Sequence, residues 1–355
     1  MTVAFYALTD LDLCRNRLPV AQHLRDAGYR VVFVGCGSTC ARDLQAAGFE
    51  FHFVSSARRN ALSDLSSTLR LVRTLRRIKP DILHTFGLRA ALRGGLAARL
   101  AHMPWVVHSV SAPPSLKNRP SRVLRTAFRE AEVTFPTKSD RDAFIAREYV
   151  RPEQTHVLRS TGIDLRKLPV SNEPDRIPIA AFISTPSGMG LQAFATAAGA
   201  INDERRMARF AVIGPAPSTE AEVLLQKWQE VGVVEWWGAR ADLSTALGSV
   251  HAICLPHDFG ELRMIEAAAV GRPIVIIGDA FNTQIIQPGE NGFVVSADDA
   301  PALASAFEEL LSNSDTRKRM GRRSRAIVES HYSADRVARE IMIVYERLYE
   351  KGRYV

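Results

Sequence analysis

The most informative chemistry in the sequence lies between Asp258 and Glu266. Asp258 precedes an apolar, alanine-rich run and Glu261 follows it by three positions, so the pair predicts a helix with Asp258 as its cap and Glu261 as the capping-box partner. The first amides of such a helix, at residues 260–264, are open to an anion, and the positive end of the helix dipole suits a diphosphate. Glu266 lies about a turn and a half into the helix, where a carboxylate can accept hydrogen bonds from paired hydroxyl groups.

Both acidic residues also have a structural interpretation. An aspartate before a helix is often only a cap, so Asp258 is interpreted equally as a cap and as a contact to a sugar. Glu266 is flanked by Ile265 and Ala267, and a carboxylate among apolar residues costs free energy unless it has a partner. We therefore expect Glu266 to bind a ligand.

The surrounding stretch, residues 251–295, carries a longer pattern. It reads HAICLPHDFGELRMIEAAAVGRPIVIIGDAFNTQIIQPGENGFVV. It resembles the donor-binding segment of retaining glycosyltransferases of family 4 (group 1), which have the GT-B fold. Their pattern is an acidic residue, seven residues, a Glu, Ala-rich sequence and Gly-x-Pro, which here corresponds to Asp258, Glu266, Gly271 and Pro273.

Other segments resemble the same family in the same order. Residues 210–217 (FAVIGPAP) are similar to its strand and glycine turn, and residues 234–240 (VEWWGAR) to its nucleoside-side segment. Residues 18–34, 79–99 and 160–165 resemble segments of its acceptor domain. The resemblance therefore covers most of the chain.

The resemblance implies a set of site residues. Glu266 would bind the ribose hydroxyls of a nucleotide, and the helix N-terminus would bind the diphosphate. The catalytic candidates are Asp258, Glu266, His108 and Ser111. The donor-binding candidates are Gly214, Trp237, Gly238, Arg240, Gly260, Glu261, Leu262, Arg263, Ser184 and Asn282.

Several positions depart from the family pattern. Asp258 stands where the family usually has Glu, and Ser184 and Met189 stand where an Arg and a Lys clamp the diphosphate. Each lost charge-assisted hydrogen bond is worth about 1.5–3 kcal/mol. Arg263 and Arg240 are the candidates to compensate, although Arg263 is also interpreted as a solvent-facing side chain.

The acceptor domain departs as well. Many family members carry a His after the fifth strand, a position that falls on Ser111 here, with His108 three residues earlier. His108 is more typical of a structural residue at a strand end than of a catalytic one. The loop at 8–13 lacks the family's glycines, so a close approach of its backbone to a ligand is not expected.

The elements that must position these residues follow from the whole chain. It has 355 residues, enough for two domains at roughly 100–200 residues each. Hydrophobic residues make up 46% and charged residues 24%, which excludes wholesale disorder, collagen and a coiled-coil rod. Prolines and glycines break the longest uncharged stretch, 177–202, so we expect no transmembrane helix.

Short apolar runs alternate with helical patterns from one end to the other, which predicts parallel sheets covered on both faces. We expect an α/β protein of two doubly wound, Rossmann-like domains, and the GT-B resemblance implies that they face each other across a cleft. Residues 1–168 would form the acceptor-side domain, 169–178 a proline-containing linker and 179–332 the nucleotide-sugar donor domain. Residues 333–355 would form a helix that packs back on the first domain.

The positive charge lies in the first half. Residues 1–175 hold 27 Lys and Arg against 16 Asp and Glu, a balance of +11, whereas residues 176–355 hold 19 against 22, a balance of −3. The helical pattern at 63–79 is densest in arginines. Three interpretations stay open for it: a packed helix with a solvated basic face, a contact to an anionic membrane surface, and a nucleic-acid contact, which is disfavoured because no aromatic residues accompany the arginines.

The four cysteines form no CxxC pair, and Asp10 and Asp12 interrupt any leader-like apolar start. We therefore expect a reducing cytoplasm, with the membrane's inner face as the alternative place of action. Cys36 and Cys40 have the spacing of metal ligands but no second pair, so no metal site is expected.

Two main functional hypotheses follow. The first is a metal-independent hexosyltransferase that uses a nucleotide-diphosphate sugar as co-substrate, needs no cofactor, and acts on a saccharide or lipid-linked acceptor in bacterial polysaccharide or envelope glycan synthesis. The second is a catalytically degenerate GT-B scaffold that binds a nucleotide sugar or a partner without turnover, as Ser184, Met189 and Ser111 suggest. A nucleotide-sugar epimerase or a phosphorylase on the same fold is a more distant alternative.

Overall fold

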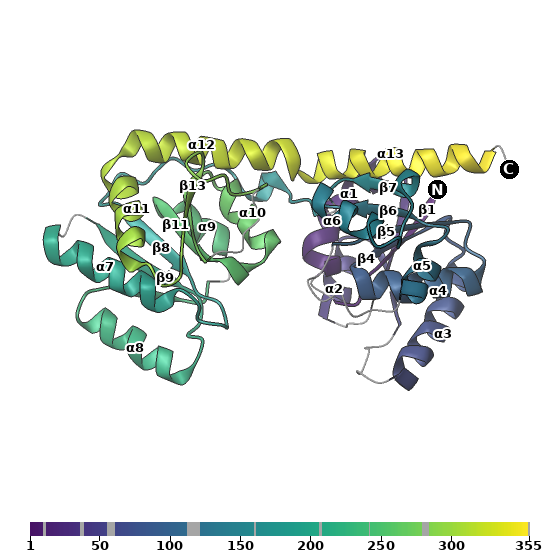
Figure 1. The fold of residues 1–355 in the computed structure, drawn as a ribbon, viewed down its shortest axis with the longest axis horizontal. Coiled ribbons are helices and arrows are strands. Elements are labelled where there is room, and N and C mark those ends of the chain that lie inside the picture. Colours follow the sequence, from purple (N-terminus) through teal and green to yellow (C-terminus); the bar gives the residue numbers. More distant parts are fainter. Residues whose placement is uncertain are drawn as a thin grey trace. The chain divides into compact units, whose positions relative to one another are not determined.

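The computed structural model describes residues 1–9, 12–35, 39–54, 61–111, 121–159, 161–205, 208–240, 242–278 and 284–353. They form two compact units (Figure 1). Unit 1 comprises Met1–Ile163 and Tyr332–Val355, and unit 2 comprises Asp164–His331. Each unit is a parallel sheet covered by helices.

The sheet of unit 1 has seven parallel strands in the order β3-β2-β1-β4-β5-β6-β7. Its central strands β1 and β4 are fully or almost fully buried, as expected of a parallel sheet with both faces covered, although β4 carries the polar residues His84 and Thr85. The strands are β1 (Thr2–Tyr6), β2 (Arg30–Gly35), β3 (Glu50–Phe53), β4 (Ile82–Phe86), β5 (Trp105–Ser109), β6 (Glu132–Phe135) and β7 (Thr155–Val157).

Helices from both ends of the chain cover this sheet. One face packs against α1 (Leu18–Asp26) and α13 (Ala334–Arg353), whose Val337, Ile341 and Tyr345 share a core with Val3 and Phe5 of β1. The other face packs against α3, α4, α5 and α6. The other helices of this unit are the π-helix η1 (Asp12–Arg17), α2 (Thr39–Ala46), α3 (Ala61–Ile78), α4 (Leu88–Ala101), α5 (Ser121–Phe128), α6 (Lys138–Ile145) and η3 (Pro152–Gln154). The short helix η4 (Leu165–Lys167) lies at the start of unit 2.

Helix α13 is also fastened by a buried polar network. The ring of His84 on β4 is hydrogen-bonded to the Tyr345 hydroxyl at 2.6 Å and to Ser109 Oγ at 2.7 Å. Ser109 Oγ continues the network to Thr134 Oγ1 at 2.7 Å. Burial holds the pKa of His84 well below its ordinary value, so the ring is neutral.

The sheet of unit 2 has six parallel strands in the order β10-β9-β8-β11-β12-β13. The four-residue or five-residue apolar runs of β8, β11 and β12 are completely buried. The strands are β8 (Ile179–Ile183), β9 (Arg209–Ile213), β10 (Glu235–Gly238), β11 (Ala252–Pro256), β12 (Ile274–Ile277) and β13 (Gly292–Val295).

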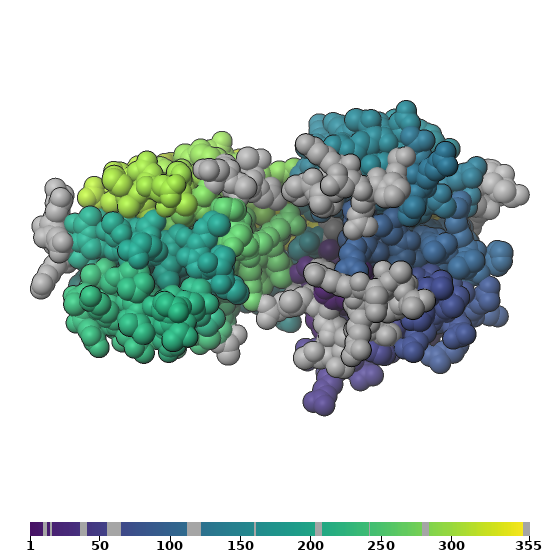
Figure 2. All heavy atoms as spheres, turned by 60° about the horizontal axis from the view of Figure 1, so that its bottom comes forward, coloured from purple at the N-terminus to yellow at the C-terminus, as the bar shows by residue number. Residues whose placement is uncertain are grey.

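Two helical layers sandwich this second sheet. Helices α7 (Leu191–Arg205), α8 (Thr219–Glu230) and α11 (Ala300–Ser312) pack on one face around Phe194, Phe210 and Phe307. Figure 2 shows the teal-to-green part of the chain, which includes α7 and α8, on the surface of unit 2. The other face carries α10 (Glu261–Ala269), which packs on α9 (Leu243–Gly248) and α12 (Ser314–His331).

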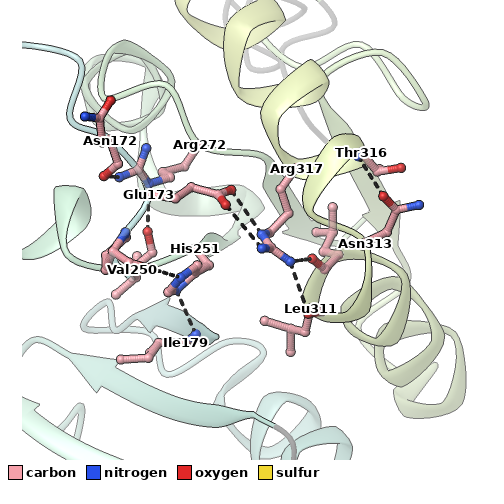
Figure 3. Close-up of polar contacts among 12 residues, drawn as sticks. Asn172, Glu173, Ile179, Val250, His251, Arg272, Leu311, Asn313, Thr316 and Arg317 are labelled. Carbon is pink, nitrogen blue, oxygen red and sulfur yellow. Dashed lines mark hydrogen bonds and ion pairs between the residues drawn. The ribbon is translucent and has the colours of Figure 1, made fainter. Parts of the chain in front are cut away.

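The proline-containing segment at 169–178 is tied into unit 2 by buried side chains (Figure 3). Arg272, only 2% exposed, donates to the carbonyls of Ser171 and Asn172 at 2.9 and 3.0 Å. Arg317 forms an ion pair with Glu173 at 3.0 Å. The segment expected to link the domains is therefore an ordered part of the second unit's surface.

The long basic helix α3 differs from its sequence-based description. Leu71, Val72 and Leu75 belong to the core beside the sheet, whereas Leu65 and Leu69 are 58% and 44% exposed. Leu65 and Leu69 therefore do not join the other leucines in that core. Within the described residues, none of the helices is both long and apolar enough to cross a membrane.

Candidate functional site

The strand order of unit 2 reverses between β8 and β11, and this point organises the candidate site. The chain leaves β8 toward β9 on one side and leaves β11 toward β12 on the other. The two strands pair directly, with Phe182 opposite Cys254. Ligands of doubly wound sheets bind outside the carboxyl ends of the strands at such a point. The loops at 184–190 and 257–260 follow these two strands and line it.

Helix α10 begins at this point without a capping side chain. Its N-cap is Gly260, at φ 88° and ψ 149°, a conformation that glycine adopts readily and other residues do not. A Cβ placed on Gly260 would meet no heavy atom within 4 Å, so the space beside this residue is open in the described part of the chain. The first turn therefore presents its amides and its positive dipole end to an anion.

The predicted capping roles of Asp258 and Glu261 are wrong. Asp258 is an exposed residue of the short 3-10 helix η5 (His257–Phe259), and Glu261 is the first residue of α10 rather than its third. The positive φ of Gly260 turns the chain into the helix, so no carboxylate is needed to cap it. Asp258 instead lies exposed beside the start of α10.

Ser184 follows β8 and is the most enclosed polar group of the site. It is 7% exposed, and its hydroxyl has no hydrogen-bond partner among the described residues. The facing residue after β9 is Gly214, where a Cβ would lie 3.2 Å from the Ser184 Cβ. Glycine at 214 is therefore what lets the two strand ends approach so closely.

The loop after Ser184 is a tight turn rich in hydroxyl groups. Thr185 Oγ1 and Ser187 Oγ are 2.9 Å apart, and Ser187 Oγ accepts a hydrogen bond from the Met189 amide at 3.2 Å. Gly188, at φ 68°, donates its amide to the Thr185 carbonyl at 3.0 Å. This loop offers neutral hydrogen-bonding groups where the family pattern has cations.

His257 is a candidate that the sequence analysis missed. Its Nδ1 is buried without a hydrogen-bond partner in the described residues. The ring lies against Gly278, which follows β12 at φ 116°, and a Cβ on Gly278 would be only 2.0 Å from Nδ1. A glycine directly after the apolar run IVII was the available signal, because a glycine at a strand end often marks a close approach of another group.

Glu266 and Arg263 form a pair along one side of α10. Arg263 Nη1 donates to Glu266 Oε2 at 2.7 Å. The side chain of Arg263 is 31% exposed and that of Glu266 is 23% exposed. Glu266 therefore has the partner that a half-buried carboxylate needs. The carboxylate still has lone pairs for further donors, and the guanidinium has further N–H groups for an acceptor.

The nucleoside-side segment is anchored by its neighbours. Trp236 Nε1 donates to the Gly214 carbonyl at 3.0 Å, and the Gly214 amide donates to the Gly238 carbonyl at 2.9 Å. Trp237 Nε1 donates to Glu235 at 3.1 Å, and the pKa of that carboxyl is lowered chiefly by its hydrogen bond from Arg209. The two contacts of Gly214 hold the carboxyl ends of β9 and β10 together at the same edge of the sheet as Ser184, whereas Arg209 and Glu235 are the first residues of these strands.

Three donor-side candidates remain. Leu262 is half-buried in the first turn of α10, and Arg240 is exposed after β10. Asn282 lies outside the described residues. In the described part of the chain, His, Cys, Asp and Glu side chains form no group of three or more that could hold a metal ion.

The unit 1 candidates separate into a core residue and a surface residue. His108 is fully buried, with Nδ1 accepting from Thr85 Oγ1 at 2.7 Å and Nε2 donating to the Ala127 carbonyl at 3.3 Å. Burial lowers its pKa to about 4. The catalytic role expected for His108 from the family resemblance is therefore corrected to a structural one, since both ring nitrogens are engaged inside the core. Ser111 is exposed, two residues beyond the end of β5.

Two family profiles match the chain. The profile described as "Glycosyltransferase Family 4" matches residues 19–167, and the profile described as "Glycosyl transferases group 1" matches residues 178–313. The two matches lie mainly in unit 1 and unit 2, respectively.

Solved structures share the whole fold. A glycosyltransferase from Rickettsia africae is 14% identical with a TM-score of 0.80, and 98% of each chain is covered. HepE of Anabaena in complex with UDP is 17% identical with a TM-score of 0.77, covering 98% of this chain and all of the other. These similarities confirm the predicted fold class of two parallel-sheet α/β domains.

Sequence relatives match over shorter stretches. The phosphatidyl-myo-inositol mannosyltransferase of Mycobacterium leprae is 35% identical over 119 residues, which is 32% of this chain and 31% of that protein. The curated relatives are matched over less than half of their own length.

Proposed function

The chain belongs to the glycosyltransferases of family 4, group 1, and on this premise we propose that it transfers a hexosyl group from a nucleotide-diphosphate sugar to a saccharide or lipid-linked acceptor. The configuration at the anomeric carbon would be retained. The observation that carries the proposal is the uncapped start of α10 at the strand-order reversal of unit 2, with Glu266 further along the same helix. The nucleotide sugar is a co-substrate, and no cofactor is included.

The diphosphate of the donor binds at the first turn of α10. Oriented amides and a helix dipole stabilise an anion without moving, so they stabilise the charge that grows on the diphosphate as the bond to the sugar breaks. The acceptor hydroxyl attacks from the face that the diphosphate leaves, so no protein nucleophile is required. The chain's contribution is to hold the reactants and the leaving group in place.

Glu266 and Arg263 divide the recognition of the nucleotide. The carboxylate of Glu266 accepts hydrogen bonds from the ribose hydroxyls through lone pairs that Arg263 does not use. Arg263, held by Glu266 at 2.7 Å, directs its remaining N–H groups to the diphosphate. In this arrangement Arg263 replaces part of the missing cationic clamp, and no metal ion is assigned to the reaction.

Ser184 and His257 supply further hydrogen bonds to the diphosphate. Each has a buried polar atom without a partner among the described residues, and burying such an atom is costly unless a ligand satisfies it. Because both residues follow strands that flank the reversal point, their polar atoms suit the phosphate oxygens of the donor. Asp258, exposed beside Gly260, is assigned to the sugar hydroxyls.

The acceptor and the place of action follow from charge and from the relatives' names. The relative from M. leprae is named as a phosphatidyl-myo-inositol mannosyltransferase. Residues 1–175 of this chain carry a net charge of +11. We propose a lipid-linked or otherwise anionic acceptor in bacterial envelope glycan synthesis, reached from the cytoplasmic face of a membrane. No nucleic-acid partner is included.

The second candidate is a scaffold that binds a nucleotide sugar without turnover. It is favoured by Ser184 and Met189 at the positions of the cationic clamp. Stabilisation by a nucleoside diphosphate is expected of both candidates. Slow hydrolysis of a nucleotide sugar without acceptor is expected only of the enzyme.

Glu266→Ala tests the donor site directly. We expect this variant to lose the increase in melting temperature that uridine, guanosine or adenosine diphosphate gives the wild type, because the ribose loses its acceptor. The matched control is Glu309→Ala on α11, which removes an exposed carboxylate of the same unit and should keep the full increase. Equal stabilisation of both variants would show that Glu266 does not bind the nucleotide.

A further inference from the structure

A second set of charged residues lies in the other unit, beside α5 of unit 1. A hollow of ≈ 500 Å³ is formed by α5, by Arg129 directly after it, and by the segment that precedes β7. Its arginines are Arg122, Arg125, Arg129 and Arg151, and its only lining carboxylate among the described residues is Glu148. The lining therefore carries a net charge of +3, four guanidinium groups against one carboxylate.

Two of these arginines have no partner in the described structure. Arg125 is paired with Glu148, and Arg151 with Glu153 at 3.3 Å. Arg122 and Arg129 have no carboxylate partner within the described residues. Arg122 and Arg125 are three residues apart on α5, and Arg129 follows the end of this helix at Phe128. All three line the hollow, so their like charges repel one another. An anion seated in the hollow would relieve this repulsion.

An apolar groove adjoins the arginine hollow. It has a volume of ≈ 250 Å³, lies between α4 and α5, and shares Arg122 and Thr126 with the hollow. Leu96 and Val123 line it and are 46% and 57% exposed. Leu100, one turn after Leu96 on α4, is 44% exposed and extends the apolar strip. Helices α4 and α5 lie side by side, so hollow and groove form one continuous surface (Figure 1).

The ligand that matches this surface has a phosphate joined to an apolar chain. Guanidinium groups bind phosphate through paired hydrogen bonds, and several of them around one hollow favour a phosphodiester with further acceptors nearby. A groove of leucine and valine beside that phosphate suits an acyl chain. A soluble phosphate would leave the groove unused, and a nucleic acid would favour exposed aromatic residues for stacking, which the groove lacks.

We propose that the surface of α4 and α5 is a binding site for an anionic phospholipid, with the headgroup phosphate among Arg122, Arg125 and Arg129 and an acyl chain along Leu96 and Val123. The site goes beyond the proposed transfer reaction. Its residues belong to unit 1, and they lie near the amino ends of β6 and β7, whereas the substrates of a doubly wound sheet bind at the carboxyl ends. It seats the first unit on an anionic bilayer.

The test is flotation of the whole protein with phosphatidylcholine vesicles that contain or lack phosphatidylglycerol. The variant Arg122→Ala/Arg129→Ala removes the two arginines without a carboxylate partner. We expect it to bind the anionic vesicles about thirtyfold more weakly, since each basic group at the surface contributes a factor of about five. The matched control is Arg70→Ala/Arg73→Ala, which removes the same charge from exposed positions on α3 and should keep most of the binding.

Equal losses in the two double variants would overturn the proposal, because they would indicate a diffuse basic surface instead of a site. A second pair tests the groove and the hydrogen-bond geometry. Leu96→Ser/Val123→Ser should weaken vesicle binding, and Arg122→Lys/Arg129→Lys, which keeps the charge but loses the planar fork, should also weaken it. Unaltered binding by both would contradict the proposed contacts.

Other ligands give distinguishable results. Stabilisation of the wild type by inorganic phosphate, without preference for anionic vesicles, would assign the hollow to a soluble anion and overturn the lipid proposal. A single-stranded oligonucleotide that binds the protein more tightly than the vesicles and displaces it from them would also overturn the lipid proposal, and would assign the surface to nucleic acid. All arginine variants should keep their stabilisation by nucleoside diphosphate, so failure here is separate from failure of the donor site.

Discussion

At the scale of single residues, the contact between His257 and Gly278 is the most restrictive feature of the candidate site. The imidazole Nδ1 occupies the space that a side chain at position 278 would need, with 2.0 Å to the position of a Cβ. It is also buried without a partner among the described residues. A buried polar atom without a partner calls for an explanation such as a bound ligand or an ordered water, so His257 is a candidate for ligand binding.

Gly278→Ala should therefore displace His257. We expect a loss of stability about 1–3 kcal/mol larger than that of Gly289→Ala, together with weaker nucleotide binding. Gly289 is the control because it also has a positive φ, 79°, but no heavy atom within 4 Å of a Cβ, so only the backbone strain is shared. Urea unfolding of both variants measures the difference in the free energy of unfolding. Equal losses would show that the His257 ring moves aside at no cost in stability.

The buried histidines of unit 1 make stability depend on pH. Burial lowers the pKa of His108 to about 4 from 6.5, so the folded protein holds this ring neutral where the unfolded chain would protonate it. The stabilisation is fully present above about pH 6.5 and is lost as the pH falls toward about 4. A difference of this size is worth about 3 kcal/mol.

His108→Gln tests this dependence. Between about pH 6.5 and about pH 4, the free energy of unfolding of the wild type should fall more steeply than that of the variant, because Gln does not titrate. Urea unfolding at a series of pH values gives both slopes. Parallel slopes would mean that His108 is not the group whose protonation opposes folding in this range.

At the scale of elements, α10 shows what the sequence could and could not predict. The helix itself, its alanine-rich face and the position of its first turn follow from the residue pattern, because apolar residues recur at helical spacing. The cap was predicted wrongly, since Asp, which has a strong cap preference, stands two residues before a glycine whose backbone alone makes the turn. A pattern of side chains does not reveal a helix start that is set by the backbone conformation of a glycine.

The partners of the site residues were the second unpredictable feature. Arg263 and Glu266 are three residues apart, so their pairing was within reach of the helical spacing. The approach of His257 to Gly278 and that of Ser184 to Gly214 join loops after different strands. Such contacts depend on strand order and register, which local periodicity does not contain.

The first turn of α10 predicts different roles for two arginines. Arg263→Ala should weaken the binding of a nucleoside diphosphate by about tenfold or more, because it removes a charge-assisted hydrogen bond to the phosphates. Arg240→Ala, which removes an exposed charge after β10, should weaken it by less than about threefold. Isothermal titration of both variants measures the ratio. Similar and small losses would leave the site without a cation and favour the neutral groups of the 184–190 loop.

At the scale of the whole molecule, the alternation of strands and helices was sufficient to predict two parallel-sheet units, and the motif of residues 251–295 pointed to the family. Buried strands of a parallel sheet are near-continuous apolar runs, and the runs of β8, β11 and β12 are visible in the sequence. The packing of the segment at 169–178 on unit 2 could not be predicted from the sequence, because Arg272 and Arg317, which bind it, are a hundred or more residues away along the chain. The arginine hollow could not be predicted either, because only the folded structure brings Arg151 close to Arg122, Arg125 and Arg129.

The whole account depends on a nucleoside diphosphate that rests on the first turn of α10. Hydrogen–deuterium exchange of the complete chain, with and without uridine diphosphate, tests this most directly. We predict slower exchange in the segments 184–190 and 257–266, with no such protection in Glu266→Ala, while α3 and α4 of unit 1 exchange as before. Protection that is absent from the start of α10, or that persists unchanged in Glu266→Ala, would contradict the proposed donor site.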